Sequence, residues 1–507
     1  MAGGPSRPVR PAKVRGRDYY GGHPPNGRGI QREREEVREN HHHLIVVGAG
    51  LAGLAAAEEA TARNPRLAVT IVESSGRFGG VLGTVREDGW LVERSADCFL
   101  AARPEGIDLV ARLGLSERLI GVDPRVRRAL VWHRGRAVPV PAGFRLLAPG
   151  RLGAILTTPL LSPLGRLRLV AERWVPPRAG AEESLQEFAV RRLGREAFER
   201  LVQPLAAGIW TADPARLGMA AACGEFAALE MNHGSLWAGE RARLRGQPAT
   251  GVATGARYGQ FVTFIDGMET LPAGLVDVLR QRGVRLCNAR AEGLARAAEG
   301  WRLSIRSTAG TAPEELAASA VILAVRAPTA AKLVTGIDPT LAVDLAAIDY
   351  AGSVIVSLGF RREDVAHPLD AAGLVVPRVA GRRALALSFS SSKFPGRAPP
   401  GHVLIRVFLG GALDPTAVAL DDNALFTQAI TEAEVLLGAR GTPRFSRIDR
   451  WDSAMPQYHV GHADRVARIE AAVARHPGLA VAGAAYRGVG IPQVIASGQV
   501  AAGQTLG

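Results

Sequence analysis

The chain has 507 residues, of which 47% are hydrophobic and 5% aromatic, and its formal net charge is +14. This length exceeds that of one ordinary domain, so we expect at least two. The charge favours an acidic partner, either a carboxylate-bearing substrate or an anionic membrane surface. We expect no nucleic-acid partner, because aromatic residues are few and do not alternate with basic ones.

The N-terminal segment, residues 1–43, is rich in Pro, Gly and Arg and predicts a disordered tail without a secretory signal. No later run approaches the roughly 18 apolar residues of a membrane-spanning helix. Three widely spaced cysteines, Cys98, Cys223 and Cys287, favour a reducing compartment over a disulfide framework. We therefore expect a cytoplasmic protein. We expect no metal site, since a His cluster such as His41–His43 beside a strand is usually incidental.

A strand–loop–helix–strand pattern follows the tail. Residues 44–47 are apolar and β-branched, as in a buried strand, and residues 52–62 have the Ala- and Glu-rich composition of a helix. Residues 68–72 predict a second strand, which ends on Glu73. The pattern predicts a βαβ unit at the start of an α/β domain.

Three glycines, Gly48, Gly50 and Gly53, occupy the first loop of this unit as G-x-G-x-x-G. This spacing permits a tight turn, the close approach of a pyrophosphate and the packing of helix on strand. The helix N-terminus offers free N–H groups to phosphates. Glu73 lies about 20 residues on, where a carboxylate accepts hydrogen bonds from ribose hydroxyls. We predict a dinucleotide site; the alternative is a Gly-rich turn in another βαβ unit.

A second glycine pair, Gly79 and Gly80, follows Arg77. A simple nicotinamide-binding domain has no need of it, whereas flavoproteins with an extended FAD use such a segment near the pyrophosphate. Here the chain resembles the FAD-dependent amine-oxidase and desaturase superfamily. Further on, Asp97 follows an alternating stretch and is interpreted either as a residue near the flavin ring or as a turn cap.

The next region contains shorter elements. We predict a helix over residues 103–119, a short strand over residues 129–132 with a hairpin at residues 133–136, and a capping box at residues 184–187. Residues 138–175 combine apolar patches with arginines and prolines, which indicates short basic amphipathic helices. They are interpreted as a monotopic membrane patch or, alternatively, as a domain cap with a solvated Arg face.

Later elements return the chain to the first domain. Residues 208–210 predict an apolar turn and residues 239–257 a Gly/Arg-rich loop. Strands are then expected at residues 261–265, 283–294, 301–305, 320–324, 353–360 and 402–408. Helices are expected at residues 271–279 and 421–437.

The C-terminal stretch is a second anchor for the cofactor. A strand at residues 479–482 leads into a glycine-spaced loop, Gly483 to Gly490, and a helix over residues 491–506 that starts beside Pro492. A helix N-terminus after such a loop favours an anion. In a flavoprotein it can face the N1/C2=O edge and stabilise the reduced, anionic ring.

Taken together, residues 44–507 resemble the protoporphyrinogen/coproporphyrinogen oxidase family of haem synthesis. Four stretches carry the resemblance: GAGLAGL with VESSGRFGG, LVQPLAAGIWTADPARL, FIDGMETLPAGLVDVL, and the pair AMPQYHVGH and AGAAYRGVGIPQVIASG. The last pair is the most specific, because other branches of the superfamily end differently. The chain departs from the family at Ser95-Ala96, where Gly-Pro is frequent, and at Val81, where a Trp-like residue is usual.

The resemblance implies a set of site residues. FAD contacts are implied at Gly48, Ala49, Gly50, Leu51, Ala52, Gly53, Glu73, Ser74, Arg77, Gly79, Gly80, Ala96, Asp97, Ala291, Val489, Gly490 and Ile491. Substrate contacts are implied at Arg128, which matches an arginine used on a propionate, and at Gly208, Ile209 and Trp210, which match a segment lining the macrocycle pocket. No catalytic residue is assigned: His459 and His462 are general-base candidates by type only, and surface or structural roles are favoured.

The resemblance also implies the chemistry. A porphyrinogen, either protoporphyrinogen IX or coproporphyrinogen III, would be dehydrogenated stepwise to the porphyrin, with FAD as cofactor and O₂ as acceptor. An apolar pocket with an arginine at its entrance suits a macrocycle that is apolar and carries propionate side chains. Two further partners are expected: the inner face of the membrane, as a peripheral contact through residues 138–175, and the next enzyme of the haem pathway, to which the product would be handed over.

The expected fold class is α/β: a Rossmann-like FAD-binding domain of the flavin amine-oxidase type, a mixed α+β substrate domain and a helical cap. The predicted boundaries are residues 1–43 for the tail; 44–105, 255–300 and 445–507 for the FAD-binding domain; 106–254 for the cap with the membrane-contact region; and 301–444 for the substrate domain. Two other readings stay open. One is an amine oxidase or carotenoid-type desaturase, and the other is a non-catalytic flavin-binding protein of the membrane surface.

Overall fold

The structure is a computed structural model that describes residues 43–178, 180–245, 261–308, 310 and 313–506. The chain divides into two units, residues 1–41 and residues 42–507. The predicted tail, apart from His43, lies outside the described residues, as does the part of the predicted loop from residue 246 to 257. Every described element belongs to the second unit.

A seven-stranded sheet in the described part of the chain carries the predicted βαβ unit. Its order is β12-β11-β10-β2-β1-β13-β19, and the strands from β10 to β19 in that order run parallel. The strands are β1 (His43–Val47), β2 (Ala68–Glu73), β10 (Arg285–Arg296), β11 (Trp301–Ser307), β12 (Glu314–Ala318), β13 (Ala320–Leu323) and β19 (Leu479–Val481).

Helices cover both faces of this sheet, as alternate side chains of β1 show. Leu44 and Val46 pack into one apolar core, and Ile45 and Val47 into another. The first core is shared with α2 (Leu51–Arg63), α3 (Pro104–Arg112), α11 (Thr270–Gln281) and α17 (Ile491–Leu506), and the second with α12 (Ala327–Val334), α13 (Pro339–Ala346) and α16 (His462–Ala474). Burial on both faces explains the uninterrupted apolar run of β1.

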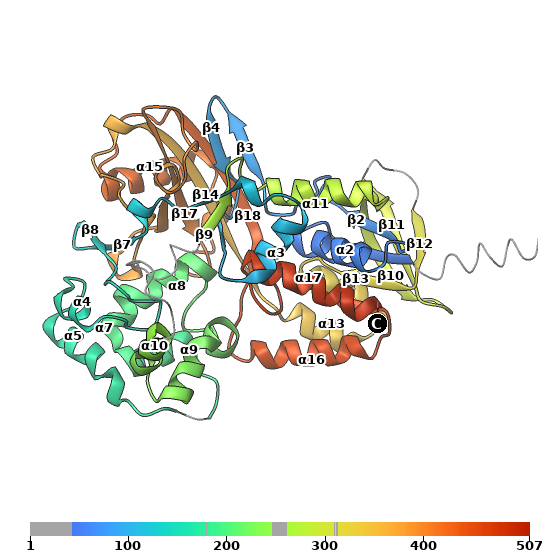
Figure 1. Cartoon of the computed structure of the whole chain (residues 1–507), viewed down its shortest axis with the longest axis horizontal. Coiled ribbons are helices and arrows are strands. Elements are labelled where there is room, and N and C mark those ends of the chain that lie inside the picture. Colours follow the sequence, from blue (N-terminus) through green and yellow to red (C-terminus); the bar gives the residue numbers. More distant parts are fainter. Residues whose placement is uncertain (1–42, 179, 246–260, 309, 311–312, 507) are drawn as a thin grey trace, which may run out of the picture. The chain divides into compact units, whose positions relative to one another are not determined.

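The last helix, α17, packs along α2, although the two lie at opposite ends of the described chain (Figure 1). A Cβ on Gly498 would lie 2.2 Å from the carbonyl oxygen of Ala52, so glycine is required for this approach. Gly503 lies near Arg63, further along both helices. The two helices are therefore parallel, and their N-termini point to the same side.

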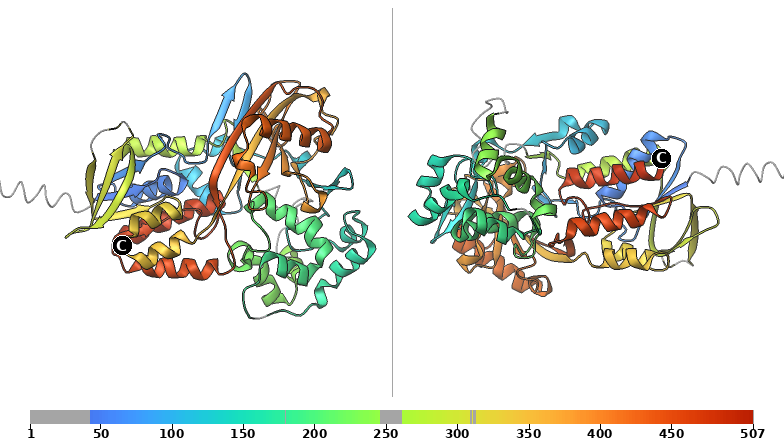
Figure 2. Two further views of the ribbon diagram at one scale, coloured as in Figure 1. Left: turned by 180° about the vertical axis from the view of Figure 1, so that it is seen from behind. Right: turned by 90° about the horizontal axis from the view of Figure 1, so that it is seen from below.

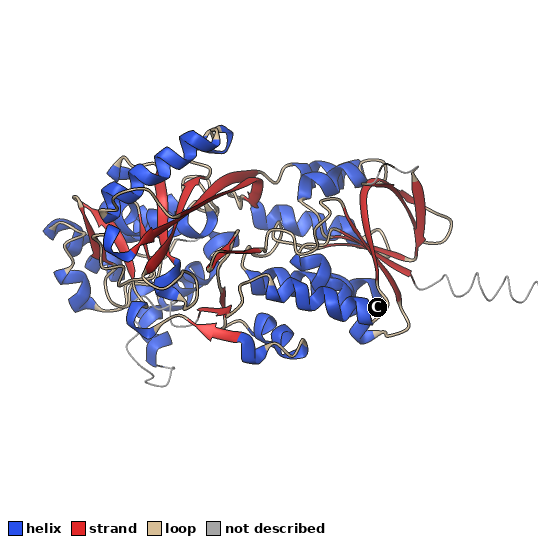
Figure 3. Ribbon diagram, turned by 90° about the horizontal axis from the view of Figure 1, so that it is seen from above, coloured by secondary structure: helices blue, strands red, loops and turns tan. Residues whose placement is uncertain are grey.

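A second seven-stranded sheet within the described residues has the order β18-β14-β17-β16-β15-β7-β8. It is antiparallel except where β15 pairs with β7. Its strands are β7 (Ala129–His133), β8 (Arg136–Pro139), β14 (Tyr350–Arg361), β15 (Gly373–Val375), β16 (Ala384–Phe389), β17 (His402–Gly410) and β18 (Phe445–Pro456). Helix α15 (Asp422–Leu437) packs on it, and α14 (Ser390–Lys393) follows β16. Figure 3 shows the strands by colour.

Residues 152–178 and 180–245 are mainly helical (green in Figure 2). The helices are α4 (Leu152–Thr157), α5 (Pro163–Val170), α6 (Leu185–Leu193), α7 (Arg195–Ala197), α8 (Gln203–Trp210), α9 (Met219–His233) and α10 (Leu236–Arg245). The predicted capping box is confirmed: Ser184 and Glu187 each hydrogen-bond to the backbone N–H of the other. Smaller sheets are formed by β3 (Thr84–Glu87) with β4 (Trp90–Glu93), and by β5 (Phe99–Leu100), β9 (Phe261–Phe264) and β6 (Leu119–Gly121).

Three local predictions were wrong. Residues 208–210 form the last turn of α8 rather than a free turn, and the helix ends at Thr211, whose φ is 48°. The predicted loop at residue 239 is instead helical up to Arg245. The helix predicted over residues 103–119 ends at Arg112, because Gly114, with φ at 68°, turns the chain.

Sheet membership also differs from the predicted boundaries. Strands β11 to β13 lie in the first sheet, although the predicted substrate domain begins at residue 301. Strands β7 and β8 lie in the second sheet, although residues 106–254 were assigned to the cap, and β18 joins them from the predicted FAD-binding segment. Partners distant in the sequence decide which sheet a short strand enters, and local patterning does not identify them.

Candidate functional site

The loop between β1 and α2 has the geometry of a phosphate-binding turn. Gly48 has φ at 103°, and a Cβ on Gly53 would lie 2.0 Å from the Gly48 carbonyl oxygen. A Cβ on Gly50, by contrast, would meet nothing within 4 Å. Gly50 begins α2 without any side-chain cap. The first N–H groups of α2, from Leu51 and Ala52 onward, have no intrahelical acceptor, and the space at the Cβ position of the preceding Gly50 is open.

Glu73 is fixed beside this loop at the end of β2. One carboxylate oxygen accepts the N–H of Ala49 at 2.8 Å, and the other accepts the N–H of Ser75 at 2.7 Å. Ser74, which lies between Glu73 and Ser75 in the chain, is exposed. In the neighbouring strand β10, Asn288 lies opposite Glu73, so Ala291 lies beyond it at the same edge of the sheet. Ligands of doubly wound sheets bind at this edge.

The second glycine pair lies directly against the first loop. Gly79 donates its N–H to the carbonyl oxygen of Ala49 at 2.8 Å, and a Cβ on Gly80 would lie 2.9 Å from the Cα of Gly50. The guanidinium of Arg77 donates to the Gly80 carbonyl oxygen at 2.6 Å, so Arg77 braces this segment. The two glycine loops thus form one continuous backbone surface. That both contact FAD stays a prediction.

The surface continues into the turn that holds Ala96 and Asp97. The Ser95 hydroxyl donates to the carbonyl oxygen of Val81 at 2.6 Å, which ties this turn to the glycine segment. The side chain of Ala96 is exposed. On its other side the turn reaches β17, because Arg406 donates to the carbonyl oxygen of Ser95.

Asp97 is the centre of a buried charge cluster that sequence reasoning did not find. Its carboxylate lies 2.5 Å from the Lys393 ammonium and 3.4 Å from the Arg406 guanidinium, and it accepts a hydrogen bond from Ser388 at 3.4 Å. Arg406 is 1% exposed and Lys393 7%. Burial alone would raise the pKa of Asp97, but the two cations hold it well below its ordinary value.

The cluster has two cations and one carboxylate, so it carries excess positive charge. The Nε of Arg406 is buried and has no hydrogen-bond partner among the described residues. Lys393 belongs to α14 and Arg406 to β17, both of the second sheet's region, whereas Asp97 belongs to the turn after β4. No periodicity or motif links these three positions, which is why sequence analysis missed the two cations.

The start of α17 lies near this turn. A Cβ on Gly106 of α3 would lie 3.0 Å from the ring of Phe99 and 3.4 Å from that of Pro492. Phe99 follows Asp97 by two residues, and Pro492 follows Ile491 by one. The predicted flavin-ring residues Val489, Gly490 and Ile491 therefore approach the Asp97 turn from the opposite end of the chain.

The predicted substrate residues all border the second sheet, but the structure does not bring Arg128 into contact with residues 208–210. Arg128 directly precedes β7, is 39% exposed and pairs with Asp370. Its Nη1 makes no hydrogen bond within the part of the chain that the structure describes. An arginine guanidinium with free N–H groups can donate hydrogen bonds to a carboxylate.

Gly208 approaches the same sheet from α8. A Cβ on Gly208 would lie 3.9 Å from Val375 of β15, and Val375 pairs with Val131 of β7. Arg128 is thus about three residues, or roughly 10 Å, along the sheet from this contact. Ile209 and Trp210 continue α8 into the apolar core of the helical region.

The two histidines have structural surroundings. His462 is fully buried, its ring stacks on that of Tyr458, and burial lowers its pKa to about 4. His459 lies beside Arg216 and Asp349, and burial with the charge of Arg216 lowers its pKa. Neither histidine contacts the surface formed by the two glycine loops and the Asp97 turn, so no general base is assigned. Among the described residues no cluster of acidic, His or Cys side chains could hold a metal ion.

This arrangement is that of an FAD-binding oxidoreductase of doubly wound type, with a second, mainly antiparallel sheet. Comparison with known proteins agrees: the chain belongs to the family described as flavin containing amine oxidoreductase, whose model matches residues 51–506. A coproporphyrinogen III oxidase of Propionibacterium freudenreichii is 34% identical, over 92% of this chain and 91% of its own. One of Bacillus subtilis is 30% identical, over 93% and 99%.

Solved structures show the same architecture. A candidate protoporphyrinogen oxidase from Exiguobacterium sp. 255-15 aligns with a TM-score of 0.78 and 28% identity, over 91% of this chain and 98% of that one. Cyclohexylamine oxidase from Brevibacterium oxydans aligns with a TM-score of 0.64 at 16% identity, which bears on the fold alone. The predicted α/β fold and the family resemblance are therefore confirmed.

FAD is the cofactor of this chain, as its family implies. The residues present fit the group: the space beside Gly50 admits a pyrophosphate at the start of α2, and the Glu73 carboxylate is held at the same edge. The parallel N-terminus of α17 and the excess positive charge around Asp97 favour negative charge nearby.

We expect Asp97→Asn to destabilise the protein, because Lys393 and Arg406 would remain buried without the carboxylate with which both form ion pairs. Breaking a buried pair in this way costs about 3–5 kcal/mol, measurable by urea unfolding. Because the pKa of Asp97 is lower in the folded state, its carboxylate contributes to the free energy of unfolding. This contribution is fully present above the ordinary carboxyl pKa and is lost as the pH falls towards the pKa of Asp97 in the folded state. The difference between variant and wild type should therefore persist near neutrality and shrink only below about pH 4.

A matched control is Glu314→Gln, which removes the partner of half-exposed Arg285. It should leave unfolding nearly unchanged, since exposed pairs contribute little. Equal effects of the two substitutions would contradict the role given to the Asp97 cluster.

Proposed function

We propose that this chain oxidises a porphyrinogen to the porphyrin in haem biosynthesis, with FAD as cofactor and O₂ as final acceptor. The observation that carries the proposal is its similarity, along nearly the whole chain, to coproporphyrinogen III oxidases. The porphyrin would pass to the next enzyme of the pathway. Amine oxidases share the fold at low identity, and no further observation favours an amine substrate.

The chain's own residues would bind and orient the reactants. Arg128, at the start of β7, holds a propionate by a charge-assisted hydrogen bond. The end of α8, from Gly208 to Trp210, provides an apolar wall for the macrocycle. FAD, when bound, supplies the electron acceptor for dehydrogenation. The charges around Asp97 and the N-terminus of α17 favour the negative charge that builds up on reduction.

Direct assay of two substrates tests the proposal. Coproporphyrinogen III and protoporphyrinogen IX differ in carboxylate count, and relatives of 30% identity or more carry the first name. Purified holoenzyme should produce fluorescent porphyrin from coproporphyrinogen III in air, with a higher kcat/KM than from protoporphyrinogen IX. Absence of turnover with both, from a protein that retains FAD, would refute the assignment.

Arg128→Ala should raise KM for the porphyrinogen roughly tenfold, the equivalent of one charge-assisted hydrogen bond, and leave FAD affinity unchanged. Arg125→Ala is the matched control, since Arg125 lies three residues away, is 87% exposed and, among the described residues, forms an ion pair with the nearby Asp123. Steady-state kinetics and FAD titration separate the two effects. Equal losses of substrate and FAD binding would count against the role of Arg128.

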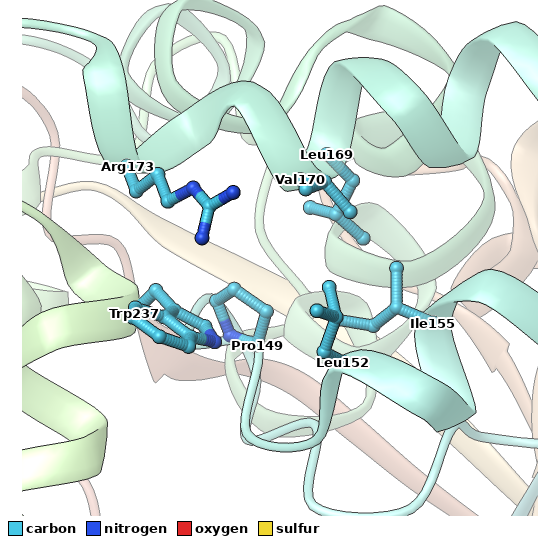
Figure 4. A pocket seen from close by; sticks show the side chains of 7 residues that line it. All are labelled: Pro149, Leu152, Ile155, Leu169, Val170, Arg173 and Trp237. Atoms are coloured by element: carbon cyan, nitrogen blue, oxygen red, sulfur yellow. The ribbon is translucent and has the colours of Figure 1, made fainter.

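We further propose that the α4–α5 patch, defined as Leu152, Leu156, Leu164, Leu167 and Trp174, contacts the membrane surface. These five side chains are exposed, Leu164 by 79% and Trp174 by 68%. Arg173 stacks on Trp174 at 4.0 Å and lines a small apolar hollow with Trp237 and Leu152 (Figure 4). Apolar side chains beside arginines are typical of a surface that binds anionic lipid. No described helix is long and apolar enough to cross a bilayer.

Flotation with anionic liposomes tests this surface. Wild type should bind at low salt and be partly released at high salt, because the arginine contribution is screened. The double variant Leu164→Glu/Leu167→Glu should lose binding. Val343→Glu, at a 69% exposed position of α13, should not. If liposome binding changes neither with salt concentration nor in the double variant, the α4–α5 patch is not the membrane contact.

A further inference from the structure

The loop that precedes α17 is held at two points by one side chain. The hydroxyl of Tyr458 donates to the carbonyl oxygen of Ala484 at 2.6 Å and accepts the N–H of Gly488 at 2.8 Å. Tyr458 is 1% exposed, so no solvent competes for these bonds. Because the two partners lie near opposite ends of the loop, the hydroxyl fixes the shape of the loop up to Val489.

The tyrosine ring is itself fixed. It stacks on the ring of His462 with centroids 4.1 Å apart and planes inclined by 13°. His462 is fully buried and its Nε2 lies 3.3 Å from the carbonyl oxygen of Tyr486, in the same loop. Burial lowers the pKa of His462 and raises that of Tyr458, so both stay uncharged near pH 7. The hydroxyl therefore keeps the proton with which it donates to Ala484.

The same segment also reaches the predicted substrate wall. The amide of Gln457 donates to the carbonyl oxygen of Trp210, at the end of α8, at 3.4 Å. The backbone carbonyl of Tyr458 accepts the N–H of Gly218 at 2.7 Å. Gln457 and Tyr458, adjacent in the chain, thus connect the end of α8 to the loop before α17.

We propose that Tyr458 is a positioning residue of the flavin site. Through Ala484 and Gly488 it sets where residues 489–491 and the N-terminus of α17 stand, and through the adjoining Gln457 it sets that position relative to Trp210. The inference rests on the proposed function in one respect: it takes residues 489–491 as the contact to the flavin ring. It does not depend on which compound is oxidised.

The variant Tyr458→Phe tests this role, because it keeps the ring and its stacking but removes both hydrogen bonds. The Kd for FAD should rise about tenfold, as expected when buried groups lose a partner. The midpoint potential of bound flavin should become more negative, since a displaced helix N-terminus stabilises the reduced anion less. Both are measured without porphyrinogen, by FAD titration of the apoprotein and by dithionite titration of the holoenzyme against a reference dye.

Tyr486→Phe is the matched control. Its hydroxyl is buried in the same loop but has no hydrogen-bond partner among the described residues. It should leave both the Kd and the potential at their wild-type values. Thermal unfolding of each apoprotein reports whether a variant merely loses stability.

Unchanged FAD affinity and potential in Tyr458→Phe would overturn the inference. A loss of affinity matched by a loss of apoprotein stability, with the potential unchanged, would overturn it as well, because Tyr458 would then support the fold alone. Failure of the proposed function would look different: wild type would show normal flavin binding and potential but no porphyrinogen turnover.

Discussion

The close parallel packing of α17 on α2 is the constraint on which the site depends. It requires a glycine at position 498, where any Cβ would collide with the carbonyl oxygen of Ala52. The approach brings two helix N-termini, formed by opposite ends of the chain, to one side of the first sheet. Each N-terminus carries unpaired N–H groups and partial positive charge. A single extended FAD, anionic at its pyrophosphate and on reduction at its ring, can use both.

A second constraint joins this half of the molecule to the other sheet. The turn from Ser95 to Asp97 is tied backward to Val81 by a hydrogen bond and forward to Lys393 and Arg406 by ion pairs. Burying these charges is costly, and the cost is offset only while all partners remain in place. The cluster therefore ties the second sheet to the turn that follows the two glycine loops. Its excess positive charge lies where the sequence resemblance places the flavin ring.

Gln457 and Tyr458 make a further link, between the end of α8 and the loop before α17. One side chain bonds to the end of α8 and the next to the loop before α17. The stretch AMPQYHVGH, one half of the most specific pair in the family resemblance, thus has a physical role other than acid–base catalysis. Its second histidine is buried and stacked, which favours a structural assignment over that of a general base.

The sequence by itself determined the local units: the β1–α2–β2 motif with Glu73, the capping box at Ser184 and the final helix α17. Each depends on residues close together in the chain, whose spacing reports backbone geometry directly. Tertiary structure alone decided the sheet to which β7 and β18 belong, and the partners of Asp97. Those outcomes depend on strand pairing and buried charge between residues far apart in the chain, and no local pattern encodes such contacts.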